Sequence, residues 1–226
     1  MTAAPYTYDD LLPLMRRAVD PLYGPEDSTL DVIWTLYDRI LDVTPATADD
    51  IARDRFYLSK GHNAHAFYSV LTAKGFIPAE WMDTAFGPDS RLGTHPDRTL
   101  VPGAEISAGS LGHGLPLAVG TALGLRAQGV DAHLYVLIGD AELDEGSNHE
   151  AIAYAGATSL GALTVIVLDN DSASHGWPGG IASRFTAHGW TATDTDGRDH
   201  DAIEKAVRAH DGRHPHVVIA RATSRI

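Results

Sequence analysis

Two apolar stretches rich in β-branched residues each end in oxygen-bearing side chains. Gly139-Asp140 follows the first stretch and Asn170 follows the second. The segment between them is rich in small residues and predicts a helix, as in two parallel strands joined by a crossover helix. Open α/β sheets bind ligands at the carboxyl ends of such strands. Since carboxylate and amide oxygens favour Mg²⁺ or Ca²⁺ over zinc, the pattern predicts a site for such a metal and a phosphorylated cofactor.

Each of these residues also has a simpler interpretation. Asp140 could cap the helix that follows it, and Asn170 could stabilise a turn. Glu142, Asp144, Glu145 and Glu150 crowd the start of the same helix. There they could complement the helix dipole as solvated carboxylates.

A glycine-rich segment and one histidine are further candidates for anion binding. Gly109-Ser110-Leu111-Gly112-His113-Gly114 could be a close packing site between helices or a phosphate nest. It is neither a P-loop nor a dinucleotide-binding fingerprint. His62 follows Gly61 at a predicted loop-to-helix junction, where amides and an imidazole could meet an anion.

The bulk composition is that of an ordinary globular chain. Its 226 residues carry a formal net charge of −13, which argues against nucleic acid or an anionic membrane as the main partner. The chain has no cysteine and therefore no disulfide or zinc thiolate site. Neither a signal peptide nor an apolar run of membrane-spanning length is visible. We expect one domain over residues 1–226 and a cytoplasmic location.

Hydrophobic periodicity and turn residues predict an alternation of strands and helices. Helices are expected over residues 8–19, from an N-cap at Ser28 to residue 41, and over 64–74, 114–127, 181–188 and 201–210, with a short helix near Trp81. Strands are expected over residues 55–59, 133–138, 165–168, 190–193 and 216–220. This order predicts an α/β fold: a doubly wound, mostly parallel sheet with helices on both faces.

Taken together, the motifs resemble the thiamine-diphosphate-binding, N-terminal part of transketolases, especially the small subunit of two-subunit transketolases. The resemblance extends from about Leu30 to Ala222. It rests on Ser59-Lys60-Gly61-His62, Gly93-Thr94-His95-Pro96, the segment 102–114, Gly139-Asp140, Glu145-Gly146, Asn170 and the segment 184–190. It implies the thiamine-diphosphate-binding fold.

The resemblance also implies roles for individual residues. Mg²⁺ (or Ca²⁺) would be held by Asp140, Asn170 and the Ser172 carbonyl. His62 and the Ala141 amide would bind the cofactor's diphosphate, with Gly139 and Glu142 in the same binding segment. The Gly109, Ser110 and Leu111 backbone would face the aminopyrimidine. The catalytic set would comprise His62, His95 in the substrate channel, and Glu145 in an acidic network between two active sites.

The implied activity is the transfer of a two-carbon ketol (or acyl) unit from a ketose or 2-oxo acid donor. A separate pyrimidine-binding subunit, in an α2β2 assembly, would have to supply the glutamate that activates the cofactor. One substrate-handling histidine of the family is missing, because Asp20-Pro21-Leu22-Tyr23 stands in its place. Two alternatives are the α subunit of a 2-oxoacid dehydrogenase and a non-catalytic scaffold or regulatory subunit.

Overall fold

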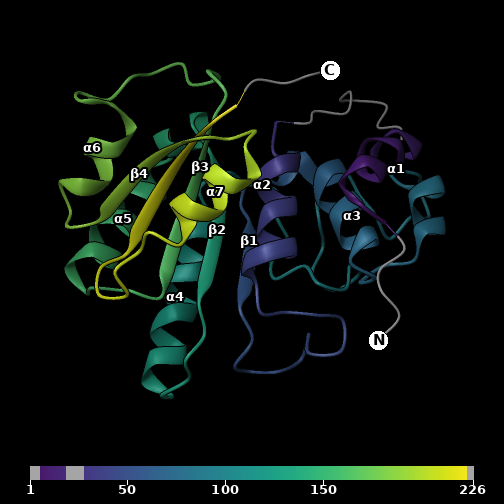
Figure 1. Ribbon diagram of the computed structural model, residues 1–226, viewed down its shortest axis with the longest axis horizontal. Coiled ribbons are helices and arrows are strands. Elements are labelled where there is room, and N and C mark those ends of the chain that lie inside the picture. Colours follow the sequence, from purple (N-terminus) through teal and green to yellow (C-terminus); the bar gives the residue numbers. More distant parts are fainter. Residues whose placement is uncertain (1–5, 19–27, 223–226) are drawn as a thin grey trace.

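The computed structural model describes residues 6–18 and 28–222 of the chain. It contains one five-stranded sheet in the order β1-β2-β3-β5-β4, and every pair of neighbours is parallel (Figure 1). The strands are β1 (Arg55–Leu58), β2 (Leu134–Gly139), β3 (Leu163–Asp169), β4 (Thr191–Asp196) and β5 (His216–Arg221). The prediction of an α/β fold with a mostly parallel sheet is therefore confirmed.

The inner strands are almost continuously apolar because both faces of the sheet are covered. In β2, Tyr135 and Leu137 face one hydrophobic core, whereas Leu134, Val136 and Ile138 face the other. All six residues of β2 are buried. The sheet is thus the shared wall of two cores, as the doubly wound prediction requires.

Helices pack on both faces of this sheet. The first core includes residues of α1 (Leu11–Arg17), α2 (Leu30–Thr35), α3 (Ala64–Ala73) and α7 (His200–Val207). The second includes residues of α4 (Gly114–Ala127), α5 (Gly146–Ala157) and α6 (Gly180–Thr186). Figure 1 shows α1 and α3 at one end of the molecule and α6 at the other.

Five short helical turns complete the fold: η1 (Tyr8–Asp10), η2 (Leu36–Ile40), η3 (Gly61–Asn63), η4 (Ala79–Thr84) and η5 (Ala141–Asp144). The single helix expected up to residue 41 is instead α2 followed by the π-helical turn η2, where the Leu41 amide donates to the Leu36 carbonyl at 2.8 Å. The predicted N-cap was wrong by one residue, since Thr29 rather than Ser28 occupies that position. The predicted end of the first helix at Val19, and Asp20–Tyr23, lie outside the described residues.

Two elements near the end of the described chain, β4 and α7, differ from their predicted limits. β4 continues to Asp196, beyond the predicted residue 193, and α7 ends at Val207 rather than at residue 210. β4 lies at an edge of the sheet, where polar side chains can point to water and also hinder edge-to-edge aggregation. Trp190 precedes the strand, and its buried indole donates to the Ile152 carbonyl at 2.9 Å.

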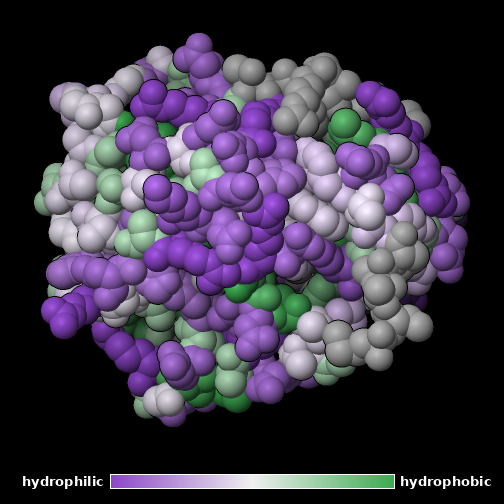
Figure 2. All heavy atoms as spheres, viewed as in Figure 1, coloured by the Kyte–Doolittle hydropathy of each residue, from purple (hydrophilic) through white to green (hydrophobic). Residues whose placement is uncertain are grey.

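Hydrophilic residues dominate the face of the molecule seen in Figure 2. Large apolar side chains that are substantially exposed are Ile51, Leu100, Leu117, Tyr154 and Trp177. Within residues 6–18 and 28–222, no helix is long and apolar enough to cross a membrane.

Candidate functional site

Asp140 lies directly after β2 and is 4% exposed. Its Oδ2 accepts hydrogen bonds from the Ser172 amide at 2.7 Å and the Ala173 amide at 2.9 Å, and its Oδ1 accepts one from the Ser172 hydroxyl. The side chain makes no capping bond to η5. Asp140 therefore stands at the N-cap position of η5 without capping it through its side chain, since the carboxylate binds the loop that follows β3 instead.

The loop after β3 turns sharply around Asp171, whose φ of 61° lies in the left-handed region. Asp tolerates this region better than most residues, and such strain often occurs at functional sites. The turn lets Ser172 reach Asp140. The neighbouring Asn170 has a solvent-inaccessible Oδ1 with no hydrogen-bond partner among the residues that the structure describes. A buried acceptor of this kind fits a missing donor or cation.

A cavity of about 140 Å³ lies between the carboxyl ends of β1, β2 and β3. The η3 turn after β1, the loop before α4 and the turns after β2 and β3 all contribute to its wall. The lining residues are Lys60, His62, Leu111, Gly139, Ala141, Glu142, Asn170 and Ser172. The structure thus brings together residues from four separate segments of the sequence, as the convergence of parallel strand ends requires.

Lys60 is a residue of this cavity to which the sequence motifs gave no role. Although it is a lysine, it is only 4% exposed. Its stem runs beside the end of β2, because a Cβ on Gly139 would lie 3.4 Å from Lys60 Cδ. Buried lysines are uncommon, and this cation adds positive charge beside His62. The sequence signal that could have identified Lys60 as a site residue was its position directly after the predicted strand 55–59.

Glu142 is also buried, at 1% exposure. Burial raises the pKa of its carboxyl, and hydrogen bonds from Ser59, Gly112 and Gly139 oppose that rise. The interpretation of Glu142 as a solvated carboxylate is therefore wrong. Asp144, by contrast, forms an ion pair with Arg184 at 3.1 Å, and Glu145 is exposed.

Several predicted residues lie around the cavity without lining it. Gly109 and Ser110 are exposed on the loop that leads to Leu111. His95 lies against the η3 turn, since a Cβ on Gly61 would be 3.1 Å from His95 Cδ2. The remaining two lie close by: Glu145 packs beside Gly112, and Asp140 lines a neighbouring cavity of about 310 Å³ with Trp177 and Arg184.

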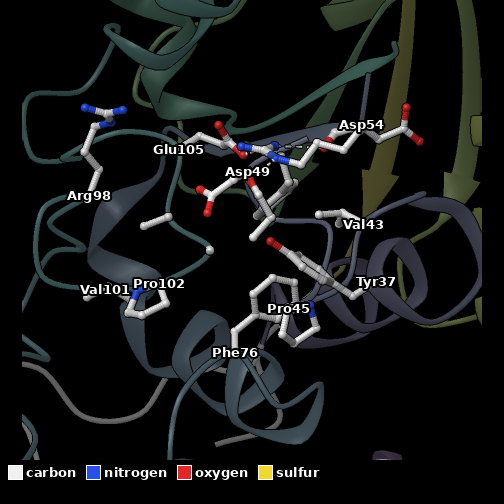
Figure 3. Close-up of a pocket in the computed structure, with 15 residues that line it drawn as sticks. Tyr37, Val43, Pro45, Asp49, Asp54, Phe76, Arg98, Val101, Pro102 and Glu105 are labelled. Carbon is white, nitrogen blue, oxygen red and sulfur yellow. Dashed lines mark hydrogen bonds and ion pairs between the residues drawn. The ribbon is translucent and has the colours of Figure 1, made fainter. Parts of the chain in front are cut away.

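A third cavity, of about 370 Å³, contains none of the predicted site residues. It lies beside the amino end of β1, because Arg53 and Asp54 precede that strand. Figure 3 shows the Tyr37 hydroxyl pointing towards this cavity, with the Glu105 carboxylate in its wall. Glu105 forms an ion pair with Arg53, which also lines the cavity. This cavity therefore lies on the side of the amino ends of the strands, whereas Asp140 and Asn170 lie at the carboxyl ends.

The donors at the strand ends fit a metal that is shared with a phosphate. Asp140 accepts three hydrogen bonds and retains acceptor capacity on Oδ1, because a carboxylate offers about four lone-pair sites. No group of three or more His, Cys, Asp or Glu side chains within the described ranges could hold a metal. One carboxylate, one amide oxygen and a main-chain carbonyl suit Mg²⁺, which usually takes further ligands from water and phosphate.

Ala141 fits the same arrangement. In the family that the motifs resemble, glycine usually follows Gly-Asp. The methyl group of Ala141 is tolerated at this position only if the backbone φ is negative. Ala141 is absent from the positive-φ residues of the described chain, which are Phe86, Ser159 and Asp171 apart from glycines. Its amide therefore remains compatible with a diphosphate oxygen at the start of η5.

Comparison with known proteins gives a family for the chain. The model of "Transketolase, thiamine diphosphate binding domain" matches residues 24–224. One of the subunits of apulose-4-phosphate transketolase from Actinobacillus succinogenes is 35% identical over 207 residues, covering 88% of this chain and 75% of that protein. "Ferredoxin fas2" of Rhodococcoides fascians is 51% identical over 225 residues, covering 96% of this chain and 73% of that protein.

Solved structures agree with this match. The chain superimposes on a mutant of transketolase from Pichia stipitis with a TM-score of 0.84 and 27% sequence identity. The match covers 96% of this chain but only 35% of the Pichia chain. The chain thus spans about a third of the length of that transketolase.

Proposed function

Because the chain belongs to the transketolase family, through its thiamine-diphosphate-binding domain, we propose that it anchors thiamine diphosphate and Mg²⁺ for a two-component transketolase-like transferase. The observation that carries the proposal is the cavity at the ends of β1, β2 and β3. There the buried Asn170 Oδ1, which has no hydrogen-bond partner within the described chain, lies at the strand end next to Asp140. The named transketolase relatives favour this branch over a 2-oxoacid dehydrogenase. The reaction is the transfer of a two-carbon ketol or acyl unit from a ketose or 2-oxo acid.

Two sets of groups hold the cofactor's charged end. Asp140, Asn170 and the Ser172 carbonyl ligate Mg²⁺ (Ca²⁺ being the other hard cation that suits them), which neutralises a diphosphate that would be costly to bury alone. The His62 imidazole and the Ala141 amide donate to diphosphate oxygens, and buried Lys60 adds a positive charge to the same wall. Leu111 supports the cofactor from the side of the α4 loop.

When bound, thiamine diphosphate supplies an ylid and an electron sink. The chain's own contribution to the reaction is the placement of groups and protons. His95 lies against the η3 turn next to His62, where its imidazole can donate and accept protons of the substrate's hydroxyl and carbonyl groups. Glu145 is exposed at the start of α5, where it can join an acidic network with a second subunit.

The rest of the catalytic centre comes from a partner subunit, which binds the aminopyrimidine and supplies the activating glutamate. Two relatives are named as single subunits of a transketolase, which supports a separate partner. Leu117 on α4 and Tyr154 on α5 are 51% and 52% exposed on two helices that pack against each other, which supports docking on this pair of helices. An α2β2 assembly and a cytoplasmic location complete the proposal.

Calorimetric titration tests the anchor. The chain is mixed with its pyrimidine-binding subunit, and thiamine diphosphate is titrated with and without Mg²⁺. Asp140→Ala is expected to weaken Mg²⁺-dependent binding by at least about 100-fold, because even outer-shell partners of a metal are worth about 10- to 100-fold. Asp201→Ala removes an equal charge from an exposed position on α7, outside the lining of both cavities, and should leave binding unchanged. Metal-independent binding, or equal binding by Asp140→Ala, refutes the proposal.

A further inference from the structure

The Glu142 carboxylate connects three separate walls of the cavity. Its Oε1 accepts hydrogen bonds from the Ser59 hydroxyl, after β1, and from the Gly112 amide at 2.8 Å, in the loop before α4. Its Oε2 accepts one from the Gly139 amide at 3.3 Å, at the end of β2. One side chain that is 1% exposed therefore joins segments that are far apart in the sequence.

A second chain of hydrogen bonds strengthens this connection. The Gly114 amide donates to Ser59 Oγ at 2.9 Å, and the Ser59 hydroxyl in turn donates to Glu142. The carboxylate therefore holds the loop directly at Gly112, and through Ser59 it also holds Gly114, the first residue of α4. Gly112 has a φ of 84°, a conformation that glycine adopts at little cost. The Gly112 carbonyl also accepts a hydrogen bond from the Ser147 hydroxyl at 2.7 Å, so two other segments hold this turn.

These contacts indicate that Glu142 acts on the cavity rather than on the cofactor. Most of the carboxylate's lone-pair sites are already used by three donors. A carboxylate has no proton to donate to a diphosphate, and its charge would repel one. Its hydrogen bonds to main-chain amides are charge-assisted and therefore strong.

We propose that Glu142 is a positioning residue that holds the loop with Leu111 in its binding conformation before the cofactor arrives. In this role the cavity is preformed, so binding does not have to order the loop. The identity of the ligand rests on the proposed function. The preformed loop itself is a property of the free chain and can be measured without ligand.

Amide hydrogen exchange in the free chain provides the first test. Glu142→Gln keeps the shape of the side chain but replaces one acceptor by an NH₂ group. Exchange at Gly112 should become roughly 10- to 100-fold faster, the loss expected for a hydrogen bond to a charged group. Exchange at Gly114 should also accelerate, because Glu142 holds the Ser59 hydroxyl to which that amide donates. Ser59→Ala, a milder change, should accelerate exchange at Gly114 and leave the Gly112–Glu142 bond in place.

Asp31→Asn is a matched control for general loss of stability. Asp31 is also 1% exposed and accepts hydrogen bonds from Tyr8, Arg198 and His200, outside the cavity. It should destabilise the chain without a selective effect on the two glycine amides. Unchanged exchange in Glu142→Gln, or equal acceleration by Asp31→Asn, overturns the inference.

Kinetics of the reconstituted enzyme provide the second test. Glu142→Gln should raise the thiamine diphosphate concentration needed for half-maximal activity by about 10-fold or more, while kcat at saturating cofactor stays close to that of the unaltered chain. A loss of kcat alone contradicts the positioning role. If the unaltered complex does not bind the cofactor, the proposed function fails, and the exchange experiment still decides the role of Glu142.

Discussion

Replacing Gly114 by alanine tests how closely α4 approaches the strand end that carries Ser59. The new Cβ would lie 2.3 Å from Ser59 Cβ and 2.9 Å from Ser59 Cα. Since one contact is with the backbone, rotation of the Ser59 side chain cannot relieve it. Overpacking of this kind costs about 1–3 kcal/mol, and loss of the Gly114–Ser59 hydrogen bond costs about 1 kcal/mol more. The gain in helix propensity is at most about 1 kcal/mol.

The free energy of unfolding should therefore fall by roughly 1–3 kcal/mol. For a chain of this size, the midpoint of thermal unfolding should drop by about 2–4 °C per kcal/mol. Gly120→Ala lies on the same helix and has nothing within 4 Å of its new Cβ, so it should be stabilising by about 0.5–1 kcal/mol. Urea denaturation of both variants measures the difference. Equal stability of the two variants would refute the close approach of α4 to Ser59.

Two further predictions concern acid stability and assembly. Burial, followed by the charges of His210 and His216, lowers the pKa of His133 to about 3. The unfolded chain binds this proton near pH 6.5, so stability should fall as the pH drops from about 6.5 towards 3, by up to about 1.4 kcal/mol per pH unit. His133→Gln should reduce that slope in urea denaturation, and an unchanged slope contradicts the assignment. Tyr154→Asp should weaken association with the partner subunit by at least about 10-fold in sedimentation experiments, whereas Ile51→Asp should not; equal effects would place the interface elsewhere.

The convergence of Asp140 and Asn170 could be predicted from the sequence because it follows from a general rule about parallel strands. The apolar runs of β2 and β3 identified the strands. The polar residues that follow them identified the carboxyl ends of these strands as the place of the site. Motif order then identified the family. These inferences depend on local patterns and on short crossover connections.

The burial of Lys60 and Glu142 could not be predicted in the same way. Both are charged residues that usually lie in water, and their burial depends on segments from elsewhere in the chain that close over them. The left-handed turn at Asp171 and the π-helical turn η2 are equally invisible in local patterns. The extension of β4 to Asp196 was missed because its last residues are polar, and their pairing with β5 depends on a later segment.

The position of β5 has a consequence for the order in which the sheet can form during synthesis. Within the described chain, β4 pairs with β5 alone, and β5 also separates it from β3. When β4 leaves the ribosome, the strand with which it pairs in the finished sheet has not yet been made. The main-chain groups of β4 that bond to β5, and the part of β3 that β5 covers, remain unpaired until residues 216–221 have been synthesised. Among the described strands, the one that comes latest in the sequence therefore lies inside the sheet, between β3 and β4, rather than at an edge.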